Sequence, residues 1–170
     1  MKDFPLMFSH SGKTINLIGK KRVNAYKKLY EYLEELQNKN IIKTHENYLD
    51  NNELAQNIYS KKYYVKDLNN DLIENKPEDV FKRLASFLST VEDTPNKQKE
   101  FSQRFYEQLF EGKFIAGGRV LAGAGDLYRL KTLANCFVSQ IDSDNIDSIY
   151  KTAFECARTY SYGGGIGVDI

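Results

Sequence analysis

The stretch GGRVLAGAGDLYRLKTLANCFVSQIDSDNIDSIYKTAFECARTYSYGGGIGVDI, residues 117–170, differs in composition from the rest of the chain. It holds most of the 11 glycines and both cysteines, Cys136 and Cys156. Two parts of it stand out, namely a cysteine inside the apolar run LANCFVSQI and the glycine cluster in YGGGIGVDI. We therefore expect the fold and the function to be organised around this stretch.

Local patterns in this stretch predict a strand, a helix and a second strand. The strand covers residues 133–141, with Cys136 and Val138 on one face and Phe137 and Ser139 on the other. Asp144 is a plausible N-cap for the helix that follows, because a short polar side chain can accept a hydrogen bond from the first turn. The glycine cluster ends this helix, and a second strand begins at about Ile166.

The segment 114–125, which precedes the first strand, is apolar and rich in glycine. It is too interrupted for a helix and its side chains are too small for an ordinary strand. We expect backbone that closely approaches another part of the molecule or a ligand.

Upstream of this segment the pattern is helical. Apolar residues recur at three- and four-residue steps over about 21–37, which predicts an amphipathic helix. A short helix is expected at 54–59, and Pro77 and the turn at 94–96 precede two more helices. Gly112 can end the last of them. We therefore predict an extended lead-in over 1–20, a mostly helical domain over 21–112 and a different domain over 113–170.

Two features of the helical part have competing interpretations. The segment 63–73 is predicted to be a turn between two short extended pieces, with its tyrosines packing rather than stacking on bases. The fragment HSGKT, residues 10–14, resembles the end of a phosphate-binding loop, but Met7 stands where that motif needs glycine. We do not expect a nucleotide loop there.

Composition excludes several function classes. The chain has 24 Lys and Arg against 23 Asp and Glu, so a formal net charge of +1 gives no global field for a nucleic-acid polymer or an anionic membrane. No apolar run approaches the ~20 residues that cross a bilayer, and no signal peptide is evident. Two cysteines and two histidines suggest neither a disulfide scaffold nor a metal site. A cytoplasmic location is the default expectation.

Neither motif is decisive by itself. A cysteine in a strand can be a small buried hydrophobe or a redox-active thiol. The glycines of YGGGIGVDI can form a helix end and a tight turn, or can let a flat ligand lie against bare backbone. They are not a dinucleotide-binding fingerprint, since here a helix precedes the glycines and a strand follows.

Taken in order, the motifs GGRVLAGAG, TLANCFV, DNIDSIY and YGGGIGVDI resemble the start of the catalytic barrel of ribonucleotide reductase large subunits. The similarity covers about residues 54–170, and the part before Phe114 resembles the helical domain that precedes the barrel. The resemblance implies an α+β chain: a mostly helical N-terminal domain followed by the first strands and helix of an incomplete ten-stranded α/β barrel. These motifs most closely resemble those of the adenosylcobalamin-dependent class II ribonucleotide reductases.

The resemblance also implies roles for single residues. Cys136 matches the cysteine that reduces the substrate: a thiyl radical takes the 3′ hydrogen, the 2′ hydroxyl leaves, and this thiol supplies reducing equivalents before it ends in a disulfide. Asn135 and Val120 match positions that line the substrate pocket, where Val120 would have to use a backbone group.

Further positions match the loop and the helix that follow. Gly164 and Gly165 match the loop on which the ribonucleotide rests. Asp144 matches a residue that holds the ribose of a deoxynucleotide effector. The helix over 145–161 resembles one that packs across a dimer interface.

The family's radical-bearing cysteine, the disulfide partner of Cys136 and most of the barrel would lie beyond Ile170. This implies an N-terminal part of a split ribonucleoside di- or triphosphate reductase, active once a C-terminal polypeptide completes the barrel. The assembled enzyme is expected to use adenosylcobalamin or, alternatively, a metal-radical small subunit, with no cofactor or metal held by this part alone. The competing hypothesis is a non-catalytic nucleotide-binding or structural module retained from a truncated reductase.

Overall fold

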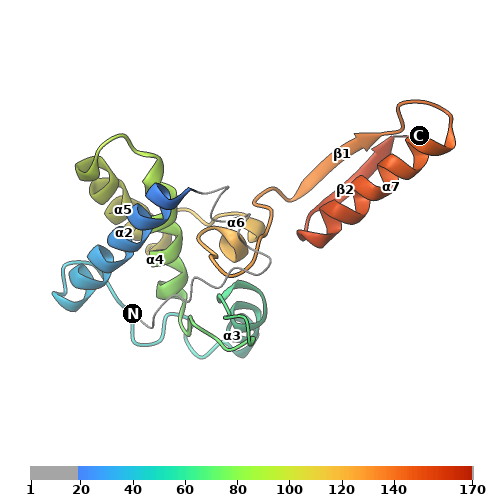
Figure 1. Cartoon of the computed structure of the whole chain (residues 1–170). Helices are drawn as coiled ribbons and strands as arrows, with labels where there is room; N and C mark the ends of the chain where they lie inside the picture. The colour runs from blue at the N-terminus through green and yellow to red at the C-terminus, as the bar shows by residue number, and fades with distance from the viewer. Residues whose placement is uncertain (1–18, 170) are drawn as a thin grey trace.

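The computed structural model describes residues 19–169, and the predicted lead-in over 1–20 lies almost wholly outside them. The described chain has a mostly helical part and, joined to it by the segment 124–135, a separate strand–helix–strand unit (Figure 1). In chain order the elements are α2 (Lys20–Asn38), α3 (Glu53–Ile58), the π-helix η1 (Tyr59–Tyr63), α4 (Pro77–Leu88), the 3-10 helix η2 (Ser89–Val91), α5 (Pro95–Phe110), α6 (Gly118–Gly123), β1 (Cys136–Gln140), α7 (Ile146–Ser161) and β2 (Gly165–Asp169).

The core of the helical part lies where α2, α4 and α5 pack together. Helix α4 is at its centre: Pro77 occupies its first turn with two acidic residues beside it, and Val80 and Leu84 are fully buried. The predicted stripe of α2 is buried against it, with Tyr26 edge-on to the ring of Phe87 at 5.9 Å between centroids. The helices predicted from periodicity and caps are therefore confirmed, including the left-handed Gly112 after α5.

A buried arginine ties the other segments to α4. The side chain of Arg83 pairs with Glu74, with 2.6 Å between Nε and Oε1, and also donates to the backbone carbonyls of Tyr63, Leu121 and Ala124. Glu74 in turn accepts a hydrogen bond from the backbone N–H of Val65. One side chain of α4 thus holds the end of η1, the 64–74 segment and α6.

The segment between η1 and α4 forms the expected turn. Lys66 and Leu72 make an isolated antiparallel bridge, and Asn70 takes the left-handed conformation at φ 70°. The prediction of a turn between two short extended pieces is confirmed from Val65 onward, whereas Tyr63 belongs to the π-helix.

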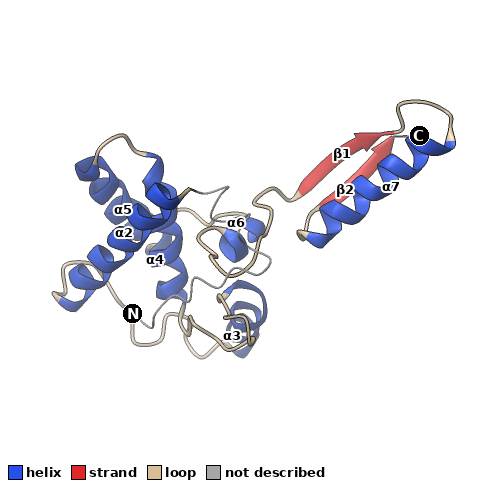
Figure 2. Ribbon diagram, viewed as in Figure 1, coloured by secondary structure: helices blue, strands red, loops and turns tan. Residues whose placement is uncertain are grey.

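The C-terminal unit is a parallel two-stranded sheet with a helical crossover (Figure 2). Cys136 pairs with Gly165 and Gln140 with Asp169, so the register is set over the full length of both strands. Helix α7 covers one face, where Ser139 Oγ lies 2.8 Å from Glu155 Oε2. Both predicted strands and the helix between them are present, and the rest of the expected barrel stays a prediction.

Two local predictions are wrong. Residues 118–123 form a short helix, because Leu121 buries its side chain in the core and its N–H donates to Gly117 O at 3.0 Å. The N-cap of α7 is Asn145 and not Asp144, since the side chain of Asn145 accepts from Ser148 N at 2.8 Å. Within residues 19–169, no helix is both long and apolar enough to cross a membrane.

Replacing Arg83 by methionine should destabilise the helical part by about 3–5 kcal/mol, because it leaves the buried carboxylate of Glu74 without its partner. The measurement is urea unfolding followed by circular dichroism. Arg104→Met is the matched control, since Arg104 pairs with Glu100 while both side chains are more than half exposed. Equal losses for the two variants would contradict the central role of Arg83.

Stability should also fall at high pH. Burial raises the pKa of Tyr64 to about 12 and raises the pKa values of Tyr26, Tyr30 and Tyr106. These phenols hold their protons more tightly in the folded chain than in the unfolded chain, where the pKa is about 10. Their contribution is therefore complete below about pH 10 and is lost as the pH rises through the folded values. Urea unfolding at a series of pH values measures this, and a flat profile up to about pH 12 would contradict it.

Candidate functional site

The face of the small sheet that α7 leaves uncovered carries the candidate thiol. Along β1, Phe137 and Ser139 turn toward α7, so Cys136 and Val138 turn away from it. Cys136 is exposed and unpaired, and Val138 is 87% exposed. The predicted alternation is confirmed, and the interpretation of Cys136 as a buried hydrophobe is wrong for this structure.

Gly165 lies directly across from this thiol. The Cys136 sulfur is 3.8 Å from the place a Cβ on Gly165 would occupy, and Gly165 N donates to Asn135 O at 2.9 Å. A thiol on a paired strand is held in a defined position, which favours a pre-oriented reaction. Asn135, Cys136 and Gly165 thus lie close together, and their role in a substrate pocket stays a prediction.

Local backbone conformation and packing explain why glycine stands at positions 163 and 164. Gly163 is left-handed at φ 83° and ends α7. Gly164 is buried, and a Cβ there would lie 2.8 Å from both the Phe137 ring and the Thr159 methyl group. Only glycine lets this backbone pass between β1 and α7. In this structure Gly164 therefore faces protein, and its contact with a ribonucleotide stays a prediction.

Val120 and Asp144 lie elsewhere. Val120 is half-buried in α6 with its side chain packed against the helical core, and its N–H donates to Gly117 O at 2.9 Å. That backbone group, which the resemblance would assign to substrate, is therefore used inside α6. Asp144 is exposed just before α7, at the far end of β1 from Asn135. Asp144, predicted to bind an effector, and Asn135, predicted to line the substrate pocket, thus lie at opposite ends of the strand.

Cys156 does not join the site. It lies half-buried on α7 as a free thiol. Among residues 19–169, no three His, Cys, Asp or Glu side chains are grouped so that they could hold a metal ion.

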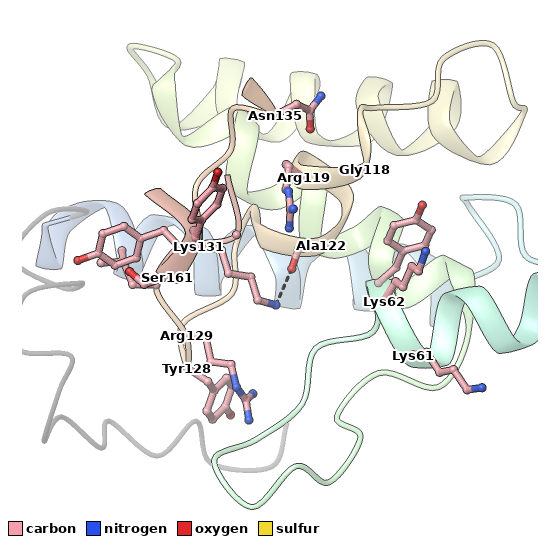
Figure 3. Close-up of a pocket in the computed structure, with 15 residues that line it drawn as sticks. Lys61, Lys62, Gly118, Arg119, Ala122, Tyr128, Arg129, Lys131, Asn135 and Ser161 are labelled. Atoms are coloured by element: carbon pink, nitrogen blue, oxygen red, sulfur yellow. Dashed lines mark hydrogen bonds between the residues drawn. The ribbon is translucent and has the colours of Figure 1, made fainter. Parts of the chain in front are cut away.

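A cleft beside Asn135 was not predicted. Residues of η1, α6, the segment 128–131 and the end of α7 enclose a volume of about 1140 Å³ (Figure 3). Its charged side chains are all cationic: Lys61, Lys62, Arg119, Arg129 and Lys131. Sequence periodicity could not reveal this cleft, because the residues that line it come from segments far apart in the chain.

Comparison with known proteins supports a resemblance to ribonucleotide reductase over part of the chain. Residues 49–129 match the family model of the ribonucleotide reductase all-alpha domain. Over 98 residues the chain is 30% identical to the ribonucleoside-diphosphate reductase subunit alpha of Synechocystis sp.. The match covers 55% of this chain and 12% of the relative, so the chain spans a small part of that protein's length. The segment 49–129, from the start of α3 to the base of the C-terminal unit, is therefore similar to the all-alpha domain of ribonucleotide reductase large subunits.

Proposed function

We propose that this chain supplies the N-terminal part of the catalytic subunit of a ribonucleotide reductase, which converts ribonucleotides to deoxyribonucleotides. The observation that carries the proposal is continuity: the segment similar to the all-alpha domain leads directly into a strand whose first residue is the exposed thiol Cys136. In the assembled enzyme Cys136 acts as one of two thiols that reduce the substrate.

The chemistry requires two reducing equivalents. Loss of the 2′ hydroxyl as water and its replacement by hydrogen consumes two electrons, which two thiols provide when they become a disulfide. Cys136 gives one thiol, and the second belongs to the remainder of the barrel. A closed, glycine-walled site around Cys136 and Gly165 would exclude water from radical intermediates.

The uncovered side of the small sheet supports completion by a second polypeptide. Within residues 19–169 the sheet has two strands only, so each strand has one edge without a neighbour. Val138 projects from the uncovered face, and an apolar groove of about 570 Å³ lies between β1 and α7, with Phe137, Phe154 and Ile166 in its lining. Further strands would bury these surfaces.

The exposed side of α7 supports a dimer of the assembled enzyme. Ile146, Tyr150 and Phe154 recur at four-residue steps and are 64%, 68% and 61% exposed. Asp144, at the head of this helix, is proposed to bind the ribose of a deoxynucleotide effector near that interface.

The radical source is proposed to be adenosylcobalamin, with a metal-radical small subunit as the other candidate. Neither of them is proposed to be held by this part of the chain alone. When bound, the cofactor supplies the oxidising equivalent that starts the radical reaction.

A second candidate function is a non-catalytic module that retains the fold. The observation that favours it is the buried core of the helical part, whose buried residues all lie between Tyr26 and Ala124 and none in the C-terminal unit. The two proposals differ in whether Cys136 matters.

Cys136→Ser should reduce deoxyribonucleotide formation to background in the complex of this chain with the polypeptide that completes the barrel. The serine hydroxyl cannot be oxidised to a disulfide, whereas nucleotide binding should persist because the strand is unchanged. Cys156→Ser is the matched control and should stay active, since that thiol lies on α7. Activity that survives Cys136→Ser would overturn the role of Cys136, and a wild-type complex without activity would favour the non-catalytic module.

Tyr150→Glu should weaken the dimer of the assembled enzyme by at least about tenfold, because it introduces a charge into the apolar stripe of α7. Sedimentation measured over a range of concentrations reports the change. Val91→Glu, at a residue that is 65% exposed on the helical part, serves as the control. A dimer that tolerates Tyr150→Glu would place the interface elsewhere.

A further inference from the structure

The cleft beside Asn135 is strongly cationic although the chain as a whole is nearly neutral. Five cationic side chains line it, and no aspartate or glutamate does. Two of its walls can be followed in Figure 3: Lys61 and Lys62 come from η1, and Arg119 comes from α6 on the other side. Like charges gathered without carboxylates repel one another, and an anion in the cleft would relieve that repulsion.

Two of the five cations already have structural partners. Arg129 donates to the carbonyls of Lys66 and Asp67 and to the Asn70 side chain, at 2.7–2.8 Å. Lys131 lies 2.9 Å from Asp126 and 3.0 Å from Ala122 O. These two side chains shape the cleft and add positive potential, but most of their N–H donors already make hydrogen bonds within the protein.

The other three cations are available. Within the described chain, Lys61, Lys62 and Arg119 make no hydrogen bond or ion pair, and all three are exposed. Some exposed lysines elsewhere are paired, as Lys43 is with Glu111 and Lys151 is with Asp142. Arg119 lies against the end of α7, with its Nη1 2.7 Å from the place a Cβ on Gly163 would occupy.

The local backbone adds a second argument. Lys61 and Lys62 are in the π-helix η1, a conformation that is rare and often found at functional sites. The carbonyl at its end, that of Tyr63, is fixed by Arg83, so this wall is anchored to the core. Tyr160, which is 60% exposed on the α7 side, offers an aromatic face within the same cleft.

We propose that this cleft binds a polyphosphate group, as carried by a nucleoside di- or triphosphate, with Lys62 and Arg119 as the principal ligands and Lys61 at the rim. Several phosphate oxygens can accept charge-assisted hydrogen bonds from both walls at once. The proposal does not depend on Cys136 or on a completed barrel, because all the ligands belong to this chain.

The test is calorimetric titration of the full 170-residue chain with inorganic tripolyphosphate, a nucleoside triphosphate and the parent nucleoside. The two phosphate compounds should bind, more weakly as salt rises, and the nucleoside alone should not. Tighter binding of the nucleotide than of tripolyphosphate would indicate that the protein also contacts the base or the sugar. Equal affinities would assign recognition to the phosphates alone.

The double variant Lys62→Gln/Arg119→Gln should weaken tripolyphosphate binding by at least about tenfold, because it removes two charged donors. Lys20→Gln/Lys21→Gln is the matched control: it removes the same charge from α2, beside a hollow whose lining includes Glu92 and Asp93. Circular dichroism verifies that both variants fold. Absence of binding at millimolar tripolyphosphate, or equal weakening in both variants, would overturn the site and would leave the Cys136 experiment unaffected.

Discussion

The buried pair of Arg83 and Glu74 is the interaction on which the arrangement of the chain depends. Burying two charges is costly unless every donor and acceptor finds a partner, and here the guanidinium also satisfies three backbone carbonyls from η1 and α6. The pair therefore fixes η1 and α6 to α4 in addition to their apolar contacts with the core. The base of the C-terminal unit is held to the helical part through α6.

The two candidate sites are adjacent, because both include Asn135. Cys136 and Gly165 face the uncovered side of the sheet, where a strand register holds the thiol. The cationic cleft lies between η1, α6 and the end of α7; its proposed ligands Lys61, Lys62 and Arg119 come from the helical part, and α7 adds uncharged lining residues. Asn135 belongs to both surroundings, because its carbonyl accepts from Gly165 and its side chain lines the cleft. A nucleotide in the cleft would therefore lie near the thiol strand.

The C-terminal unit is the part with the least burial. Its sheet has two strands, one face is covered by α7, and Val138, Tyr150 and Phe154 remain largely exposed. Surfaces of this kind are stabilised by partners, which agrees with a proposed function that requires both barrel completion and a dimer. The helical part, in contrast, has its own buried core.

The main helices, the two strands and the side of β1 on which Cys136 lies could be predicted from the sequence, because periodicity and capping act over a few residues. The sequence-based prediction was wrong for α6, because burial of Leu121 outweighs the poor helix propensity of glycine. It was also wrong for the N-cap of α7, because the side chain of Asn145, and not that of Asp144, accepts the hydrogen bond from Ser148 N. Tertiary contacts determine that Gly164 is a packing residue, that the Val120 N–H is used inside α6, and that cations from three segments share one cleft. Those outcomes depend on contacts between residues far apart in the chain, which local patterns do not encode.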